Sequence, residues 1–404
     1  MRPPTLLRRV KGLLAFLSFT SEVRMDRRIF IANGTKASVG LAAFPNAAFA
    51  GADRRGPFSM ARPVQNTTLH LNHNSNPLGT PPRARAAILE AMEDLPYYPG
   101  PRRGTLRARL AKLHDVPADQ VVLGSGSTEL IRTAIQAHAS PQSRILQADP
   151  TYEDAVRYGE PFPYRIELVP LTSEFAHDVE RMRGLAEGWR EPTVVYICNP
   201  NNPTGTLTPS AEVDDWISSA SDHVFFIVDE AYFPFVDDAT YWSAEKWARE
   251  RSNVLVTRTF SKLYGMAGLR IGYGLCHAET ARRLNLYATH SNPNTLAIAG
   301  ALGALEEEGW QEKSLRTWDQ CKEVVTTCLD ELGLHYFQSQ TAFLFHEIRG
   351  DQTLYIRRME DHGILVGRPF PPMLSHNRLS LSAMPEELGR FAETLRMFRR
   401  RGWV

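Results

Sequence analysis

The chain has 404 residues, of which 43% are apolar and 23% charged, and its formal net charge is +1 at pH 7. This balance is typical of a globular enzyme and excludes a disordered or fibrous protein. The small net charge excludes a general electrostatic attraction to nucleic acid or acidic membranes. The length predicts two or three domains. Four scattered cysteines do not form a disulfide framework or a metal motif, so we expect small core or surface thiols and no bound metal.

Residues 1–50 are predicted to be a leader rather than part of the folded protein. The pair Arg27-Arg28 precedes a weakly apolar stretch, and Ala48-Phe49-Ala50 offers small residues at the two positions that a signal peptidase reads. The segment resembles a twin-arginine export signal that starts at Met1 or Met25, which predicts a periplasmic or exported protein. A non-functional leader would instead be a disordered extension of a cytoplasmic protein. No later stretch has the ~20 uninterrupted apolar residues of a membrane span.

The rest of the chain alternates helix-period stretches with short β-rich runs and contains no internal repeat. Several runs are apolar on both faces, as in a parallel sheet covered by helices. We therefore predict an α/β fold: a large domain over 85–299 with a mostly parallel central sheet flanked by helices, and a smaller α+β domain over 300–404. Residues 51–84 are expected to form an N-terminal arm that joins the small domain. The predicted strands are 121–123, 144–148, 194–197, 224–228, 254–257, 271–275, 344–348 and 378–382.

Polar or glycine-rich segments follow most of the strands of the large domain. Open α/β sheets bind ligands at the carboxyl ends of their strands. We therefore expect these segments to meet in one site, in the cleft between the two domains. The segments are 124–128, 149–152, 199–205, 229–232 and 259–262.

Two of these segments carry charges that need partners. Asp229 ends a buried strand, where a carboxylate is costly unless it meets a cation. Thr259, Ser261, Lys262 and Arg270 place two hydroxyls, an amine and a guanidinium within twelve residues. This combination suits a phosphorylated aldehyde.

In their order and spacing, these segments resemble the fold-type I pyridoxal-phosphate aminotransferases of class I and II, and among them the histidinol-phosphate aminotransferase branch. The resemblance covers nearly all of residues 67–400 and rests on five elements in the same order. It implies an enzyme that uses pyridoxal 5′-phosphate to move an amino group between an amino acid, or an amino-acid-like donor, and a 2-oxo acid.

The resemblance implies chemical roles for four residues. Lys262 would hold the cofactor as a Schiff base and then move the proton from the substrate Cα. Asp229 would pair with the pyridine nitrogen, so that the ring can absorb electrons. Tyr232 and Asn202 would hydrogen-bond the phenolic oxygen of the cofactor and adjust the pKa of the imine.

Further residues are implied to hold the rest of the cofactor. Tyr152 would stack on the face of the ring. The phosphate would lie at the N-terminus of a helix, where backbone amides and the helix dipole favour an anion, with an arginine to balance the charge. The implied phosphate-binding residues are Ser127, Thr128, Thr259, Ser261 and Arg270.

Substrate and subunit contacts are implied as well. Tyr98 matches a tyrosine that reaches the cofactor phosphate of the neighbouring subunit, which implies a homodimer. Arg378 matches the arginine that binds the substrate α-carboxylate as a fork, and Arg368 and Asn74 are further candidates for substrate contact. The family's Asn-Glu-Asn-Pro signature has Ser75 in place of the acid. This departure and the predicted export both argue against histidinol phosphate as the substrate.

Two other functions stay open from sequence alone. The same site supports decarboxylation, racemisation or oxidation, because the fate of the carbanion depends on substrate orientation and on water access. Arg378 favours chemistry in which the carboxylate is kept. A non-catalytic pyridoxal-phosphate-binding protein is the other alternative, but it would be expected to lose Lys262 or Asp229, and both are present.

Overall fold

Seven strands form the central sheet of the protein, in a computed structural model that describes residues 68–404. The strands are β2 (Val121–Gly124), β3 (Arg144–Asp149), β4 (Arg165–Pro170), β5 (Thr193–Cys198), β6 (Val224–Asp229), β7 (Val254–Thr259) and β8 (Gly272–Cys276). Their order across the sheet is β2-β8-β7-β6-β5-β3-β4, and β8 alone runs in the direction opposite to the other six strands. The predicted α/β fold with a mostly parallel sheet is therefore confirmed. The predicted leader lies outside the described residues.

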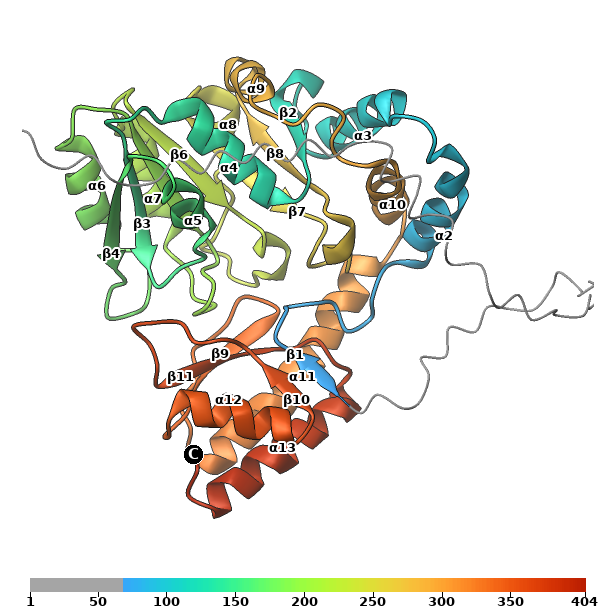
Figure 1. Cartoon of the computed structure of the whole chain (residues 1–404), viewed down its shortest axis with the longest axis vertical. Coiled ribbons are helices and arrows are strands. Elements are labelled where there is room, and N and C mark those ends of the chain that lie inside the picture. Colours follow the sequence, from blue (N-terminus) through green and yellow to red (C-terminus); the bar gives the residue numbers. More distant parts are fainter. Residues whose placement is uncertain (1–67) are drawn as a thin grey trace, which may run out of the picture. The chain divides into compact units, whose positions relative to one another are not determined.

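Helices cover both faces of this sheet, which explains why its strands are apolar on both sides (Figure 1). Along β5, Val194 and Tyr196 pack into the core on one face, whereas Val195 and Ile197 pack into the core on the other. The first face is covered by α4 (Ser127–His138), α5 (Asp154–Gly159) and α9 (Ala278–Asn285). The second is covered by α3 (Gly100–Leu113), α6 (Val179–Glu187), α7 (Ser210–Ser219), α8 (Glu245–Glu250) and α10 (Thr295–Leu305), and α2 (Pro82–Glu90) packs on α10. Short 3-10 helices are η1 (Ala91–Asp94), η2 (Ala118–Gln120), η3 (Phe233–Phe235) and η4 (Ala267–Leu269).

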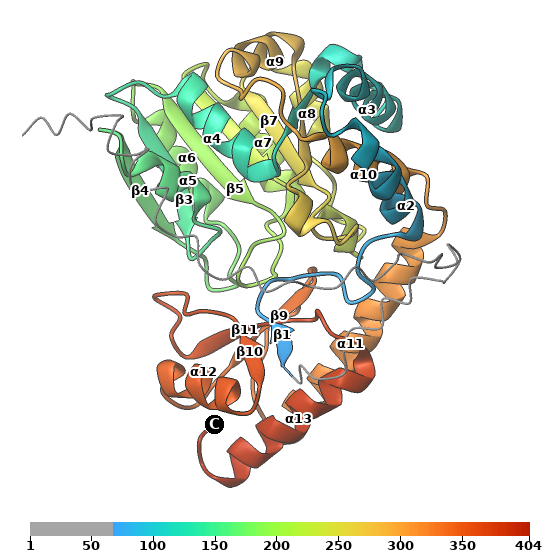
Figure 2. The same ribbon diagram turned by 45° about the vertical axis from the view of Figure 1, so that its right-hand side comes forward.

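The C-terminal residues form a second apolar core of their own, which we call the small lobe (Figure 2). It contains β1 (Leu69–Leu71), β9 (Phe343–Glu347), β10 (Ile364–Val366), β11 (His376–Ser380), α11 (Trp310–Leu332), α12 (Gln352–Asp361) and α13 (Pro385–Arg400). β1 pairs with β10 in parallel, and β9 pairs with β11 in antiparallel. The segment that follows β1 is therefore held beside the C-terminal strands, although nearly 300 residues separate them in sequence. The predicted domain boundaries stay predictions.

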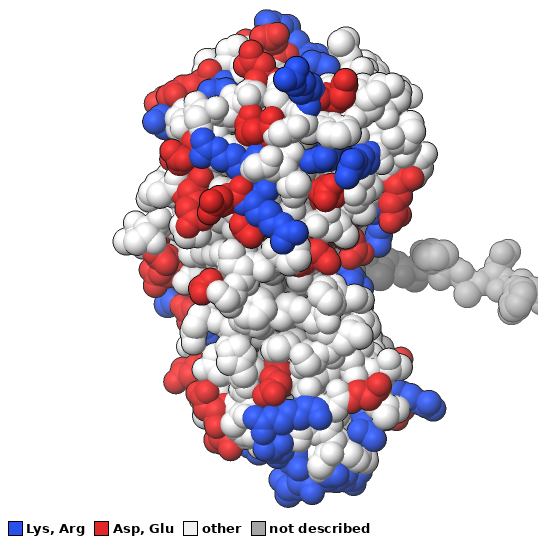
Figure 3. Space-filling model, turned by 90° about the vertical axis from the view of Figure 1, so that its left-hand side faces the viewer, with Lys and Arg blue, Asp and Glu red and all other residues white. Residues whose placement is uncertain are grey.

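The distribution of surface charge and the state of the cysteines agree with the near-neutral net charge and the low cysteine content of the sequence. Figure 3 shows basic and acidic side chains interspersed over the upper part of one face. All four cysteines are buried free thiols, as predicted. Within residues 68–404, no helix combines the length and the apolar character needed to cross a bilayer.

A buried ion pair joins the ends of β6 and β7, the two central strands that lead into the candidate site. Arg258 donates to Oε2 of Glu230 from Nη2 at 2.8 Å and from Nε at 3.1 Å. The two residues are almost completely buried, with side-chain exposures of 11% and 1%. Because Glu230 follows Asp229 and Arg258 precedes Thr259, the pair fixes two functional strand ends relative to each other.

We expect Glu230→Ala to lower the free energy of unfolding by about 3–5 kcal/mol, because it leaves a buried guanidinium without its main partner. Within residues 68–404, only Glu245, at 3.4 Å, would then remain as an acidic partner of Arg258. Urea denaturation of the two proteins measures the difference. Glu230→Gln, which keeps the hydrogen bonds to Ser243 and to the Ala244 amide possible, should lose less. Equal stability of Glu230→Ala and the wild type would contradict this role.

Candidate active site

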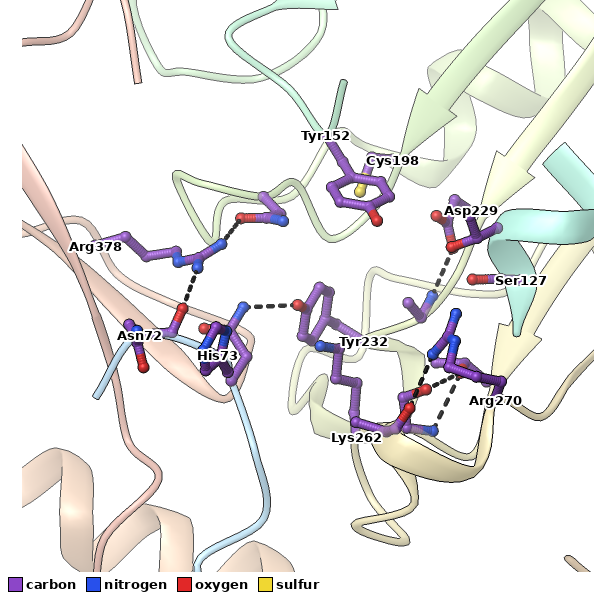
Figure 4. Close-up of a pocket in the computed structure, with 17 residues that line it drawn as sticks. Asn72, His73, Ser127, Tyr152, Cys198, Asp229, Tyr232, Lys262, Arg270 and Arg378 are labelled. Carbon is purple, nitrogen blue, oxygen red and sulfur yellow. Dashed lines mark hydrogen bonds between the residues drawn. The ribbon is translucent and has the colours of Figure 1, made fainter. Parts of the chain in front are cut away.

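A cavity of about 270 Å³ lies at the carboxyl ends of the central strands, on the side that faces the small lobe (Figure 4). Twelve of the predicted site residues line it together: Asn74, Ser127, Thr128, Tyr152, Asn202, Asp229, Tyr232, Thr259, Ser261, Lys262, Arg270 and Arg378. Five more lining residues were not predicted: Asn72, His73, Cys198, Ala231 and Ala267. The structure therefore gathers side chains from five strand ends and from the small lobe around one space.

Asp229, the last residue of β6, carries a carboxylate that lies 2% exposed. It accepts hydrogen bonds from the Tyr196 hydroxyl at 2.9 Å, and from the Thr257 hydroxyl and the Ala231 amide at 3.1 Å each. Burial raises the pKa of Asp229 to about 6, although these hydrogen bonds act in the opposite direction. Among the described residues, no basic side chain forms an ion pair with it. A cation presented from the cavity would supply the missing partner.

Lys262 lies in the loop that follows β7. Its Nζ is 5.7 Å from the centroid of the Tyr232 ring. Burial and the positive charges of Arg378 and Arg270 lower the pKa of Lys262 to about 8, whereas Asp229 acts in the opposite direction. The neutral amine, which is the form that acts as a nucleophile or a base, is therefore far more populated near pH 7–8 than for an ordinary lysine. The loop turns at Gly265, where φ is +60° and a Cβ would lie 2.2 Å from the carbonyl oxygen of Gly79.

The N-terminus of α4 forms one end of the cavity, as the glycine-rich turn before it predicts. Ser127 begins the helix after Gly126, which has φ +79°. A Cβ at Gly126 would lie 2.3 Å from Nη2 of Arg270, so glycine is needed for the guanidinium to approach the helix end. The Thr259 hydroxyl donates to Oγ of Ser261 at 2.9 Å beside it. Helix amides, hydroxyls and a guanidinium in one place form a site for a phosphate-like anion.

Arg378, on β11, lies on the small-lobe side of the cavity and is only 8% exposed. Its Nη1 donates to Oδ1 of Asn202 at 2.8 Å, and its Nη2 donates to the carbonyl oxygen of Asn72 at 2.9 Å. Its Nε has no partner among the described residues. Burial lowers the pKa of Arg378. These contacts fix the direction of the guanidinium and leave N–H groups for a ligand.

Asn74 is held close to the phenol of Tyr232. Its Nδ2 donates to the Tyr232 hydroxyl at 2.8 Å, and its backbone N–H donates to Oγ of Ser380 at 2.9 Å. Burial raises the pKa of Tyr232, which therefore stays a phenol at neutral pH. Tyr152, which follows β3, also lines the cavity and is only partly buried (Figure 4).

Two predicted residues lie outside this cavity. Tyr98, just before α3, is 85% exposed at the surface. Arg368 lies in a neighbouring cavity of about 520 Å³, which shares Asn72, His73 and Arg378 with the first. The structure thus places Arg368 beside the site, and it leaves Tyr98 away from the site of its own chain.

The unpredicted lining residues gave little or no signal in the sequence. Asn72 contributes its backbone carbonyl, which no side-chain pattern reveals. His73 is adjacent to Asn74, but β1, which positions both, is only three residues long. Ala231 contributes its backbone amide to Asp229, and Ala267 carries no polar side-chain group. Cys198 is buried, and burial raises its pKa, so it stays a neutral thiol.

These groups fit pyridoxal phosphate. The carboxylate of Asp229 lacks a cation, which a protonated pyridine nitrogen would supply. The N-terminus of α4 and Arg270 offer an anion site. Lys262 places a partly neutral amine in the same cavity, as attachment to an aldehyde requires.

Comparison with known proteins agrees with this geometry. A family model described as aminotransferase class I and II matches residues 66–395. The chain is 30% identical over 368 residues to histidinol-phosphate aminotransferase 1 of Nitrosococcus oceani, which covers 87% of this chain and 96% of that protein.

Solved structures show the same fold. A protein of Erwinia carotovora atroseptica, provisionally assigned as a histidinol-phosphate aminotransferase, is 32% identical, with a TM-score of 0.81 and coverage of 83% of this chain and 97% of that chain. The histidinol-phosphate aminotransferase of Sinorhizobium meliloti, solved with pyridoxal-5′-phosphate, is 23% identical, with a TM-score of 0.77 and coverage of 83% and 91%.

Proposed function

Because this chain belongs to the class I and II aminotransferases, which are pyridoxal-phosphate-dependent transaminases, we propose that its amino donor is a free α-amino acid whose carboxylate binds Arg378. The observation that supports this is the position of that guanidinium. It is buried and lines the cavity, and Asn202 and Asn72 orient it while each accepts only one N–H, from Nη1 and Nη2. A planar guanidinium with free N–H groups binds a carboxylate as a fork. A 2-oxo acid would bind the same arginine in the return half-reaction.

We prefer this donor to histidinol phosphate, the substrate in the names of the relatives. Histidinol phosphate has no carboxylate, so with that donor Arg378 would bind only the 2-oxo acid of the return half-reaction. Ser75 also replaces the acidic residue of the family signature close to Asn74, which lines the cavity.

Two residues carry the proposed proton chemistry. Lys262 would hold the cofactor covalently, and its Nζ, once released, would take the proton from the substrate Cα. Asp229 would keep the pyridine nitrogen protonated by pairing with it. The bound cofactor supplies a cationic aromatic ring that stabilises negative charge at the substrate Cα. The pKa of about 8 at Lys262 lets its amine accept and return a proton near neutral pH.

The other lining residues would position the cofactor. Ser127, Thr128, Thr259, Ser261 and Arg270 would hold its phosphate. Tyr152 would stack on the ring, and Tyr232 and Asn202 would donate to the phenolic oxygen. Asn74 would orient the hydroxyl of Tyr232, to which it already donates.

The test is the absorbance of the purified holoenzyme during additions of single amino acids and 2-oxo acids. An amino donor should shift the cofactor band to that of the aminated form, and a 2-oxo acid should restore the original band. A protein whose cofactor band responds to no amino acid would refute the proposal.

Arg378→Gln is expected to raise KM for amino acids about 100-fold, because it removes the partner of a buried carboxylate. Arg378→Lys, which keeps the charge but not the fork, should be intermediate. Steady-state kinetics with the best donor of the panel measures both variants, and an unchanged cofactor band shows that the site is intact. An unchanged KM in Arg378→Gln would rule out the assigned carboxylate contact.

We also propose that the enzyme is a homodimer in which Tyr98 reaches the site of the other subunit. In support, an exposed apolar stretch precedes α3. Its members are Leu89 (68% exposed), Met92 (50%), Leu95 (53%), Tyr97 (72%) and Tyr98 (85%). Such a patch is typical of a protein interface. Sedimentation equilibrium tests this directly, and a monomeric holoenzyme would contradict it.

Export is a further proposal, which rests on Arg27-Arg28 and Ala48-Phe49-Ala50 alone. Twin-arginine transport moves folded proteins, which suits an enzyme that loads its cofactor before export. N-terminal sequencing of the protein from its native host tests this. We expect Gly51 as the first residue, and a start at Met1 or Met25 would contradict export.

A further inference from the structure

The cavity next to the candidate active site is in a position to receive the side chain of the substrate. It has a volume of about 520 Å³ and shares Asn72, His73 and Arg378 with the first cavity. An amino acid held by Arg378 through its carboxylate therefore borders both spaces. The remaining walls are Ile356, Glu360, Leu365, Val366, Arg368 and Pro369. We call this second space the distal pocket.

Arg368 is the cation that a charged side chain would meet in the distal pocket. Its guanidinium is packed 4.1 Å from the centroid of the Phe370 ring, and its Nη1 donates to the carbonyl oxygen of Pro369 at 2.8 Å. With Arg378 nearby, two guanidinium groups face one pocket, an arrangement that favours a ligand with two anionic groups.

A carboxylate of the protein already occupies Arg368, however. Oε2 of Glu153 accepts from Nη2 of Arg368 at 2.5 Å. Glu153 comes from the loop after β3, directly after Tyr152, whereas Arg368 follows β10 in the small lobe. The other oxygen of Glu153 accepts from Arg157 at 3.0 Å, which holds the carboxylate in place.

The solvent exposure of the Glu153–Arg368 ion pair determines how easily a substrate anion can displace Glu153. The side chain of Arg368 is 46% exposed and that of Glu153 is 37% exposed. Ion pairs of this exposure are weak. A substrate anion can therefore displace Glu153, but it must compete with it and also meets its negative charge. An uncharged substrate side chain neither competes with Glu153 for Arg368 nor is repelled by its charge.

We propose that Glu153 determines the charge preference of the distal pocket, by occupying Arg368 and so weakening the binding of substrates with an anionic side chain relative to uncharged ones. The inference rests on the proposed function, since it takes an amino acid on Arg378 as its premise. Glu153 acts through Arg368, and it is a specificity-determining residue rather than a catalytic one.

The test compares amino acids that differ in side-chain charge. Two pairs are nearly isosteric, aspartate with asparagine and glutamate with glutamine, and a third pair, phosphoserine with serine, differs in size as well. Each is measured as an inhibition constant against the best donor of the panel, with holoenzyme, so that members that react slowly are still informative. Glu153→Gln is expected to improve the binding of the anionic member relative to the uncharged member about fivefold. An unchanged ratio in all three pairs would overturn the proposal.

Matched variants separate a charge effect from a structural one. Glu160→Gln makes the same charge change at an exposed position at the end of α5, outside both cavities, and should leave the ratios unchanged. Arg368→Gln should weaken the anionic members. In that background Glu153→Gln should improve them less than it does in the wild type, because only the repulsion by Glu153 is left to remove. If the ion pair served only to hold the two lobes together, Glu153→Gln would shift both members of each pair equally. The result is distinguishable from failure of the proposed function, in which no amino acid would move the cofactor band of the wild type.

Discussion

Lys262→Ala is expected to reduce transamination by about four orders of magnitude or more, because it removes the base that moves the Cα proton and the amine that attaches the cofactor. The variant should still bind the cofactor without a covalent bond, since the α4 N-terminus, Arg270 and Asp229 are untouched. Single-turnover absorbance with the best donor measures the rate. Borohydride reduction followed by denaturation measures attachment: the wild type should retain the cofactor and the variant should lose it.

Lys246→Ala is the matched control for this experiment. Lys246 is a lysine of α8 whose Nζ lies 4.7 Å from the centroid of the Trp247 ring, outside the cavity. It should leave both the rate and the covalent attachment unchanged. Appreciable transamination by Lys262→Ala, or retention of the cofactor after denaturation, would assign the proton transfer or the attachment to another group.

Much of the fold was predictable because burial leaves a direct trace in the sequence. The central strands are apolar on both faces, and the six predicted for the large domain are all present. β4 was missed because it is an edge strand, with exposed Arg165 and a mixture of polar and apolar residues. β1 and β10 were missed because each has three residues, and they are stabilised by pairing with each other across the sequence, Leu69 with Ile364. Local pattern contains no information about such a pairing.

In the candidate site, too, some features could be predicted from the sequence and others could not. The family, the enzyme class and the cofactor predicted from sequence are confirmed by the relatives. Twelve predicted residues line the cavity. They could be predicted because each carries a distinctive chemical group just after a strand or a glycine turn, or matches a family position. The contacts among them were not predictable: Arg378 binds Asn202, and Asn74 binds Tyr232, between residues far apart in sequence. The ion pair of Glu153 with Arg368 is likewise a product of the three-dimensional fold.

Asp229 should contribute a loss of stability to the cofactor-free protein as the pH rises from 4 to 6. The buried His138, His177 and His346, whose pKa values burial lowers to about 4, contribute in the opposite direction. The pKa of Asp229, about 6 in the folded protein, lies above the ordinary value of 3.8, so the folded state holds a proton that the unfolded chain has already released. Stability is lost wherever the folded state binds more protons. By pH 8 the loss attributable to this carboxylate is on the order of 3 kcal/mol. Urea denaturation of the cofactor-free wild type and of Asp229→Asn at pH 4 and pH 8 measures it, as the change with pH in the difference between the two proteins.

Asp229→Asn should remove this loss and, at the same time, the activity. The amide is nearly isosteric, and the hydroxyls of Tyr196 and Thr257 can rotate to match it. The cofactor-free variant is therefore expected to be more stable than the wild type at pH 8 and similar to it at pH 4. With cofactor bound, it should lose at least about 100-fold in transamination, because no negative charge remains to keep the ring nitrogen protonated.

Asp149→Asn separates the effect on the pH dependence of stability from the effect on transamination. Burial also raises the pKa of Asp149, at the end of β3, but this residue does not line the cavity. Its variant should alter the pH dependence of stability in the same direction and spare transamination. If Asp229→Asn were instead less stable than the wild type at pH 8 without cofactor, the carboxylate would already have a cationic partner within the protein. The pairing of Asp229 with the cofactor nitrogen would then lose its electrostatic basis.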